Sequence, residues 1–405
     1  MTAPLVVIGS GIAGVSAAGA ARAGGFEGDI VLLDDEAQLP YRRPPVSKEI
    51  VRREKDADGI RIKPAEWYDK QRIDLRLGVA AAAVDVDARR VDLVGGGSIE
   101  YGQLVLATGG SARRPWDAAG IRTLRSLADV PALTDELTGG GRLVVVGAGL
   151  IGSEIAASAR AQGVGVTLLE TAAQPLPRLL TPDLAALYAE LHAEAGTELV
   201  TGVEVTSIET VGDVTTVTAA DGRTWSAPVV VVAVGMTPNV GLAEAAGLTL
   251  ADGIGGIVVD AAGRTSAPDV FAAGDVAAFP HPLTGDLQRV EHWQHAQRHG
   301  TAVGQTVAGA DTRYDDVPWC WSDQYGHTLQ VTGWPRADHE VVVRGSLTER
   351  DFTAFFLDGG TVVGAVALGR PAEIRAVRTW IGDRLSPDAT VLADDAAELK
   401  SAVPE

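Results

Sequence analysis

The chain has 405 residues, of which 46% are hydrophobic and 21% charged, and it contains 48 glycines. This length favours two or three domains, and the composition is that of a compact soluble α/β enzyme rather than of a disordered, fibrous or low-complexity chain. The 53 acidic and 34 basic residues give a formal net charge of -19, which opposes non-specific binding to nucleic acid or to an anionic membrane surface.

Cysteine content and the first residues bear on the cellular setting. Cys320 is the one cysteine of the chain, so an internal disulfide or a dithiol redox pair is excluded and a reducing, cytoplasmic setting is expected. Met1 to Pro4 leads into an apolar run without a basic region, and no segment reaches the roughly 18 apolar residues that span a bilayer. We therefore expect neither secretion nor a membrane span, and we expect no metal site.

The first predicted element is a short apolar strand at residues 5–8, which continues into the glycine turn 9–14 and then into an Ala-rich helix. In such a turn the first glycine permits a tight bend, the second lets the backbone approach a pyrophosphate, and the third lets the helix pack on the strand. A second strand at 30–33 ends in Asp34 and Asp35, where a carboxylate can bind ribose hydroxyls. The pattern predicts a dinucleotide-binding unit.

A second copy of this pattern follows later in the chain. An apolar strand at 142–146 enters the glycine turn 147–152, a helix is predicted from Ser153 to about Ala161, and a further strand at 166–169 ends in Glu170. Glycine turns also join strands to helices in proteins that bind no nucleotide, but two complete copies argue against that interpretation.

Two further segments support a resemblance to a known superfamily. The strand 104–106 opens into Ala107, Thr108 and Gly109, and the segment 265–275 ends in Gly274 and Asp275. Asp275 alone would also fit the N-cap of a helix. With these segments the chain resembles the two-dinucleotide-fold flavoprotein disulfide reductase superfamily, whose first unit binds FAD, whose second binds NAD(P)H, and whose Gly-Asp acid holds the FAD ribityl chain.

Within that superfamily, residues 40–48 narrow the resemblance. Thiol-dependent members carry one or two cysteines in this segment, whereas this chain reads Pro-Tyr-Arg-Arg-Pro-Pro-Val-Ser-Lys, which resembles the Arg-Pro-Pro-Leu-Ser-Lys segment of NADH-dependent ferredoxin reductases. Residues 289–297 and 317–325 are similar to two later segments of that family, with Cys320 in place of a Phe. Such reductases supply electrons, through ferredoxins, to Rieske-type dioxygenases or haem-thiolate monooxygenases.

The resemblance implies site residues by position. For FAD these are Gly9, Gly11, Ile12, Ala13, Gly14, Asp34, Asp35, Arg43, Lys48, Ala81, Ala107, Thr108, Gly109, Arg125, Gly274, Asp275 and Trp293. For NADH they are Gly147, Gly149, Leu150, Ile151, Gly152, Glu154, Glu170 and Gly235. Lys48 and Glu154 are expected to be catalytic, with Glu154 beside the nicotinamide and paired with Lys48. Each of two residues also has a simpler interpretation. Glu154 could be an acid that only stabilises the helix dipole, and Arg125 could be a solvated surface arginine.

The implied fold class is α/β, with two Rossmann-like, glutathione-reductase-like dinucleotide-binding domains and a C-terminal α+β domain. We expect an FAD domain at 1–110 and 238–312, an NADH domain at 111–237 and a C-terminal domain at 313–405. Residues 85–101 are expected to form a β-hairpin around three glycines.

The implied function is transfer of electrons from NADH through FAD to a two-iron two-sulfur ferredoxin, and thence to a cytochrome monooxygenase or a Rieske dioxygenase. Two alternatives remain at this point: an NADH oxidase or disulfide reductase, and an NADH-responsive binding protein like apoptosis-inducing factor. The absence of a cysteine from residues 40–48 argues against an oxidase or disulfide reductase. The acidic net charge and the absence of a long insertion argue against an NADH-responsive binding protein. Residues 42–63 hold eight bases and four acids. This segment is either a ferredoxin-docking surface or a solvated helix and loop.

Overall fold

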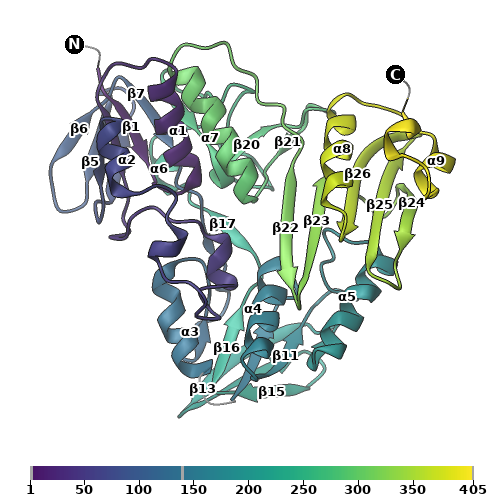
Figure 1. Ribbon diagram of the computed structural model, residues 1–405. Helices are drawn as coiled ribbons and strands as arrows, with labels where there is room; N and C mark the ends of the chain where they lie inside the picture. Colours follow the sequence, from purple (N-terminus) through teal and green to yellow (C-terminus); the bar gives the residue numbers. More distant parts are fainter. Residues whose placement is uncertain (1–2, 138–140, 404–405) are drawn as a thin grey trace. The chain divides into compact units, whose positions relative to one another are not determined.

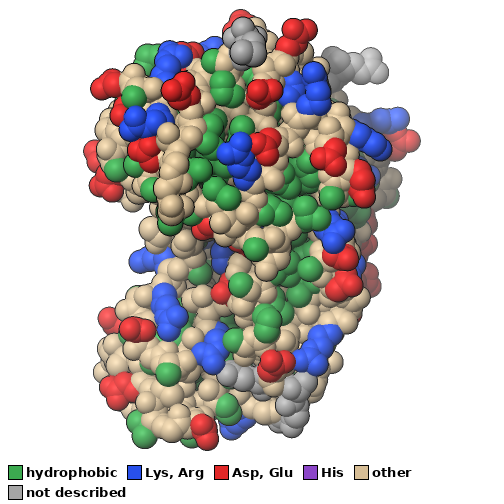
Figure 2. Space-filling view, turned by 90° about the vertical axis from the view of Figure 1, so that its left-hand side faces the viewer, with side chains coloured by type: hydrophobic (Ala, Val, Ile, Leu, Met, Phe, Trp, Pro, Cys, Tyr) green, Lys and Arg blue, Asp and Glu red, His purple; other side chains and the backbone are tan. Residues whose placement is uncertain are grey.

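The computed structural model describes residues 3–137 and 141–403 (Figure 1). Backbone contacts divide the chain into two compact units, each built from three segments. Unit 1 comprises residues 1–42, 57–111 and 236–316, and unit 2 comprises residues 43–56, 112–235 and 317–405. Within the described ranges, no helix is long and apolar enough to cross a membrane. Acidic, basic and apolar side chains are interspersed over the face that Figure 2 draws.

Unit 1 is built on a five-stranded parallel sheet with the order β19-β7-β1-β2-β3. Four of its strands are wholly or largely buried because they are short apolar runs covered on both faces, and the edge strand β3 is only partly buried. The strands are β1 (Leu5–Ile8), β2 (Ile30–Leu33), β3 (Ile73–Arg76), β7 (Gln103–Leu106) and β19 (Val270–Ala272).

Helices α1 (Ile12–Ala23) and α7 (Trp293–Val307) lie side by side in unit 1 (Figure 1). Two glycines of α7 permit this close approach. A Cβ on Gly300 would lie 2.2 Å from the Ala13 carbonyl oxygen, and a Cβ on Gly304 would lie 2.2 Å from that of Ala17. The remaining helices of the unit are α2 (Ala65–Lys70) and α6 (Gly241–Ala245).

Unit 1 also carries smaller sheets. Strands β5 (Arg90–Leu93) and β6 (Ser98–Glu100) form the predicted hairpin, which is confirmed, and β4 (Ala81–Asp85) adds a third antiparallel strand that was not predicted. Strands β18 (Ile257–Val258), β20 (Ala277–Pro280) and β21 (Leu287–Gln288) form another sheet. Strands β8 (Gly110–Ala112) and β17 (Met236–Pro238) pair where the chain passes from one unit to the other.

Unit 2 repeats the architecture of unit 1. Its parallel sheet has the order β12-β11-β10-β16-β9, and an antiparallel sheet β13-β14-β15 is inserted between β12 and β16, as β4-β5-β6 is between β3 and β7. The strands are β9 (Ile121–Arg122), β10 (Arg142–Val146), β11 (Gly165–Leu169), β12 (Thr197–Val200), β13 (Val205–Val211), β14 (Val214–Ala219), β15 (Thr224–Ala227) and β16 (Val229–Val232).

The helices of this half are α3 (Val130–Leu137), α4 (Leu150–Ala161) and α5 (Pro182–Glu194). Helix α4 begins three residues before the predicted Ser153 because Gly149 is its N-cap, so the residues between the second and third glycines already form its first turn. The glycine run 139–141 predicts a turn, and Gly139 and Gly140 lie outside the described residues.

The C-terminal part of unit 2 is an antiparallel sheet with the order β22-β23-β26-β25-β24 and two short helices, which confirms the predicted α+β character. Its strands and helices are β22 (Trp319–Gln324), β23 (His327–Gly333), β24 (Glu340–Ser346), β25 (Asp351–Asp358), β26 (Thr361–Leu368), α8 (Pro371–Gly382) and α9 (Ala389–Ala393). One face of this sheet shares a core with α5, and the other packs against α8 and α9.

Candidate functional site

In unit 1, the predicted FAD positions meet at one edge of the parallel sheet. Strands β1, β2, β7 and β19 run in the same direction, so their carboxyl ends lie together. The chain order reverses between β1 and β7, and ligands of open α/β sheets bind at such a switch point. The turns that follow these strands are 9–14, 34–35, 107–109 and 274–275.

The first glycine turn separates the requirements of the fold from those of a ligand. Gly9 has φ +101°, and a Cβ on it would lie 2.3 Å from the Ala107 carbonyl oxygen. A Cβ on Gly14 would lie 1.9 Å from the Gly9 carbonyl oxygen. On Gly11 it would meet no atom of the described residues within 4 Å. The protein therefore requires the first and third glycines, and the second leaves free space of the kind that a pyrophosphate fills.

The two acids after β2 differ in what they contact. The Ser10 backbone N–H donates to Asp34 Oδ2 at 2.5 Å, and the Glu36 N–H donates to Asp34 Oδ1 at 2.9 Å. Asp34 therefore fixes the glycine turn, and Asp35 is the more exposed of the pair. Burial and then the charge of Asp34 raise the pKa of Asp35. The two acids therefore differ: Asp34 holds the turn, and Asp35, which the family resemblance places at the FAD site, lies exposed beside it.

Neighbouring contacts hold the other turns of this edge. Thr108 Oγ1 donates to the Asn239 carbonyl at 2.8 Å, and Asn239 Nδ2 donates back to the Thr108 carbonyl at 2.9 Å. Arg289 Nη1 donates to the Asp275 carbonyl at 3.3 Å. Ala81 begins β4 close to this edge, since the N–H of Val79 bonds the carbonyl of Asp34. Trp293 is the first residue of α7.

The NADH positions of unit 2 have the same geometry at the switch point between β10 and β16. A Cβ on Gly147 would lie 2.5 Å from the Ala233 carbonyl oxygen, and one on Gly152 would lie 1.9 Å from that of Gly147. On Gly149 it would again meet no described atom within 4 Å. The predicted Leu150 and Ile151 form the first turn of α4, and Gly235 follows β16 with φ +103°.

Glu170 occupies the place in unit 2 that Asp34 occupies in unit 1. Its Oε2 accepts the Ala148 N–H at 2.8 Å, and its Oε1 accepts the Ala172 N–H at 2.9 Å. Thr171 follows Glu170 where unit 1 has a second acid, so Glu170 is the carboxylate at the end of β11 that can face an adenosine ribose, through the lone pairs that its two backbone partners leave free.

A buried charged cluster lies elsewhere in unit 2. The Lys48 ammonium is 3.3 Å from Glu154 Oε1 and 2.9 Å from Asp323 Oδ2. Lys48 is 4% exposed and Glu154 is 5% exposed. Both carboxylate oxygens of Glu154 also accept hydroxyl donors, Oε2 from Ser47 at 2.5 Å and Oε1 from Ser322 at 2.7 Å.

Burial and hydrogen bonding act in opposite directions on the two acids of this cluster. Burial raises the pKa of Glu154, against the stabilising charge of Lys48 and the hydrogen bonds from Ser47 and Ser322. For Asp323, burial acts to raise the pKa, but hydrogen bonds from Thr328 and Lys48 outweigh it and the pKa is lowered. One cation therefore serves two carboxylates of different proton affinity.

The predicted contact between Lys48 and Glu154 is present, but sequence reasoning missed three members of the cluster. Ser47, Ser322 and Asp323 stood in the segments that carry the family resemblance, yet no role was inferred for them. Arg43 Nη1 donates to the Arg125 carbonyl at 2.9 Å. The predicted FAD positions Arg43, Lys48 and Arg125 belong to unit 2, and the other FAD positions belong to unit 1.

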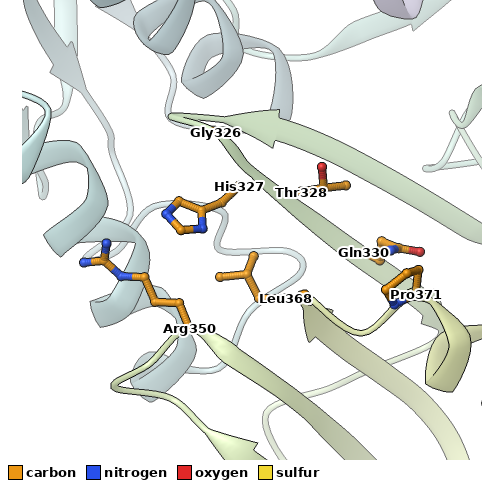
Figure 3. Close-up of a pocket in the computed structure, with 8 residues that line it drawn as sticks. Gly326, His327, Thr328, Gln330, Arg350, Leu368 and Pro371 are labelled. Atoms are coloured by element: carbon orange, nitrogen blue, oxygen red, sulfur yellow. The ribbon is translucent and has the colours of Figure 1, made fainter.

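A separate pocket of about 440 Å³ lies on the C-terminal sheet of unit 2 (Figure 3). It is lined from β23, β26 and the neighbouring turns by Gly326, His327, Thr328, Gln330, Arg350, Leu368, Gly369 and Pro371. None of the predicted site residues is among them.

Comparison with known proteins assigns the family. Residues 3–300 match the family model of pyridine nucleotide-disulphide oxidoreductases, and residues 319–403 match that of the reductase C-terminal domain. The chain belongs to the pyridine nucleotide-disulphide oxidoreductase family. The family resemblance and the fold class predicted from the sequence are thereby confirmed.

Two curated relatives match the chain over nearly its whole length. It is 36% identical over 409 residues to putidaredoxin reductase of Pseudomonas putida, covering 98% of this chain and 96% of the relative. It is 39% identical over 404 residues to the ferredoxin–NAD(+) reductase component of the anthranilate 1,2-dioxygenase system of Burkholderia cepacia, covering 98% of each.

Solved structures of family members give the same result. Putidaredoxin reductase in its covalent complex with putidaredoxin matches with a TM-score of 0.94 and 35% identity over 99% of this chain and 98% of that one. The ferredoxin reductase of the CYP199A2 system of Rhodopseudomonas palustris matches with a TM-score of 0.94 and 35% identity over all of both chains. As a pyridine nucleotide-disulphide oxidoreductase with both glycine turns in place, the chain uses FAD and NADH.

Proposed function

We propose that this chain is an NADH-dependent, FAD-containing ferredoxin reductase that supplies a two-iron two-sulfur ferredoxin serving a cytochrome monooxygenase or a Rieske dioxygenase. The observation that carries this proposal is the duplicated switch-point geometry: in each unit the second glycine faces open space, and the acid that ends the second strand accepts an amide of the glycine turn. Bound FAD supplies the chemistry that no side chain can, since it accepts electrons in pairs from NADH and releases them singly.

Residues of unit 1 are assigned to FAD as follows. The turn 9–14 would hold the pyrophosphate, the Asp35 carboxylate would accept hydrogen bonds from the adenosine ribose, and Asp275 would hold the ribityl chain. Thr108 and Trp293 complete the site from the ends of β7 and α7. The assignments of the turn 9–14, Asp35 and Thr108 rest on their common sheet edge, and the roles of Asp275 and Trp293 rest on the family resemblance.

In unit 2, the turn 147–152 is assigned to the NADH pyrophosphate and Glu170 to the adenosine ribose. The carboxylate of Glu170 favours a free 2′-hydroxyl because a 2′-phosphate would bring like charges together. This argument favours NADH over NADPH.

Lys48 and Glu154 are assigned to the reacting ends of the two cofactors. The Lys48 ammonium provides positive charge that stabilises electron-rich flavin. Hydroxyls of Ser47 and Ser322 fix the Glu154 carboxylate in one orientation, as a group that positions a nicotinamide must be fixed. The same hydroxyls partly offset the cost of burying its charge.

Thiol chemistry has no support in this chain. Cys320 is buried, and burial raises its thiol pKa to about 12, so a thiolate that could relay electrons is disfavoured. The single cysteine also supports the proposed cytoplasmic setting.

The proposed domain boundaries are an FAD domain at 1–110 and 238–312, an NADH domain at 111–237 and a C-terminal domain at 313–405.

Reconstitution with FAD followed by anaerobic mixing with NADH tests this function. The expected results are one non-covalent FAD per chain and rapid loss of its visible absorbance on addition of NADH. Catalytic transfer to an added two-iron ferredoxin should then follow. A protein that binds no FAD, or binds it without reduction by NADH, would contradict the proposal.

A further inference from the structure

Helix α7 carries histidines that the assigned chemistry does not use. His295 and His299 are one turn apart and thus lie on one face of the helix, with 2% and 0% of their surface exposed. They contact the aromatic side chains of Phe279 and Tyr314. Ring centroids are 4.9 Å apart for Phe279 and His295 and 4.7 Å apart for His299 and Tyr314, and both pairs are stacked. His295 Nδ1 also lies 2.8 Å from the Tyr314 hydroxyl.

One member of this cluster contacts a turn assigned to the flavin. The backbone N–H of Gly274 donates to His299 Nδ1 at 3.3 Å, and both groups are buried. Because Nδ1 accepts this bond, the imidazole proton resides on Nε2. Burial lowers the pKa of His299 to about 4, so its acceptor nitrogen stays available at neutral pH.

The backbone of the turn at Gly274 and Asp275 is sterically constrained. Gly274 has φ +78°, and a Cβ on it would lie 2.7 Å from the Ala13 Cβ. Asp275 follows directly, and its backbone carbonyl accepts a hydrogen bond from the Arg289 guanidinium. The orientation of the Gly274 amide therefore decides where Asp275 is presented.

We propose that His299 is a positioning residue for the flavin: its Nδ1 holds the Gly274 amide and thereby sets the turn that presents Asp275. This inference rests on the proposed function, which assigns Asp275 to FAD. It assigns to His299 a role in cofactor affinity that is distinct from packing in the aromatic cluster.

Two substitutions separate the acceptor from the packing. In His299→Asn, the amide oxygen occupies the same side-chain position as Nδ1 of histidine. The hydrogen-bond acceptor is therefore kept, while the packing of the imidazole ring is lost. In His299→Leu, apolar volume is kept and the acceptor is lost, which leaves the buried Gly274 N–H unpaired. His192→Leu is the matched control, since His192 is a fully buried imidazole in unit 2 whose Nδ1 bonds the Tyr325 hydroxyl.

The measurement is the dissociation constant of FAD, from recovery of flavin fluorescence on dilution, with visible circular dichroism of the bound flavin as a second readout. We expect His299→Leu to weaken binding by about three- to tenfold, the loss typical of one buried hydrogen bond. The FAD dissociation constant of His299→Asn should lie closer to the wild-type value than that of His299→Leu. The control His192→Leu should leave FAD affinity unchanged. Asp275→Asn should weaken binding more than any of these.

The outcomes distinguish the inference from its foundation. If Asp275→Asn weakens FAD binding and His299→Leu does not, or if Leu preserves binding better than Asn, the positioning role is overturned and the flavin assignment stands. If Asp275→Asn leaves FAD affinity unchanged, the assignment of Asp275 fails and the role of His299 fails with it.

Discussion

At the scale of single residues, Glu154 combines burial with a full set of partners. Its carboxylate contacts one cation and two hydroxyls, and the cation is shared with Asp323. An exposed acid that interacts only with the helix dipole would have none of these partners. That alternative interpretation of Glu154 therefore does not fit the structure. The cost of burying its charge remains visible in its raised pKa.

The raised pKa of Glu154 predicts a specific pH dependence of stability. Between the ordinary value of 4.5 and the higher folded value, the folded chain holds a proton that the unfolded chain releases. The free energy of unfolding therefore falls as pH rises through this window, by up to about 1.4 kcal/mol per pH unit. Glu154→Gln should lose that slope. Urea denaturation of both proteins at several pH values measures it, and parallel curves would contradict the prediction.

Glu170 predicts cofactor preference at the same scale. We expect kcat/KM to be at least about tenfold higher with NADH than with NADPH, and Glu170→Gln to reduce that ratio by removing repulsion of the 2′-phosphate. Steady-state kinetics with an artificial electron acceptor give both values. Asp183→Asn, which neutralises an exposed acid of α5, serves as the control. Equal kcat/KM values in the wild type would remove the role given to Glu170.

At the scale of elements, the two glycine turns have the same division of labour. In each, the first and third glycines are required by close backbone contacts, and the second faces open space. The same sequence motif therefore contains positions for the fold and one position for the ligand.

Substitutions by alanine should separate these positions. Gly14→Ala places a Cβ 1.9 Å from the Gly9 carbonyl oxygen, and overpacking of this kind costs about 1–3 kcal/mol or more. We expect reduced thermal stability with and without FAD. Gly11→Ala should keep the stability of the FAD-free protein and weaken FAD binding. Thermal unfolding and FAD titration of both variants test this, and loss of FAD-free stability in Gly11→Ala would contradict the assignment.

Prediction from sequence succeeded for elements with local signals and failed for long-range pairs. The strands before both turns were predicted because short apolar runs followed by glycine specify them locally. Strand β4 was missed because its Ala-rich sequence has low strand propensity. Asp323 was missed because it lies 275 positions from Lys48 along the chain. The contact of Asp34 with the Ser10 amide was not predicted, since only the direction of the turn decides which of the two acids faces that amide.

At the scale of the whole molecule, the net charge of -19 opposes an acidic ferredoxin unless basic side chains attract it locally. The basic segment 42–63 is divided between the two units. Several of its bases are paired with acids: Arg52 with Glu54 at 2.8 Å, Lys55 with Glu49 at 3.0 Å, and Arg53 with Asp135 at 3.5 Å. Such pairing reduces the local field, and the exposed fractions of the side chains are 24% for Arg52, 51% for Arg53 and 43% for Lys55.

Charge reversal tests ferredoxin docking at Arg52, Arg53 and Lys55. Replacing all three by Glu should raise KM for ferredoxin by about tenfold at low salt and weaken its salt dependence, while reduction of artificial acceptors by NADH stays unchanged. The control reverses Arg223, Arg336 and Lys400, which are exposed and likewise paired with acids. Equal effects of the two triple variants would show that net charge acts and that this segment is not the docking surface.

Transfer to ferredoxin is the central claim, and one coupled assay tests it most directly. The FAD-loaded protein is mixed with NADH and cytochrome c, and purified two-iron two-sulfur ferredoxins, putidaredoxin among them, are added in turn. The account predicts cytochrome reduction that depends on both NADH and ferredoxin and saturates with ferredoxin concentration. Reduction of an artificial acceptor by NADH without stimulation of cytochrome reduction by any ferredoxin would contradict it.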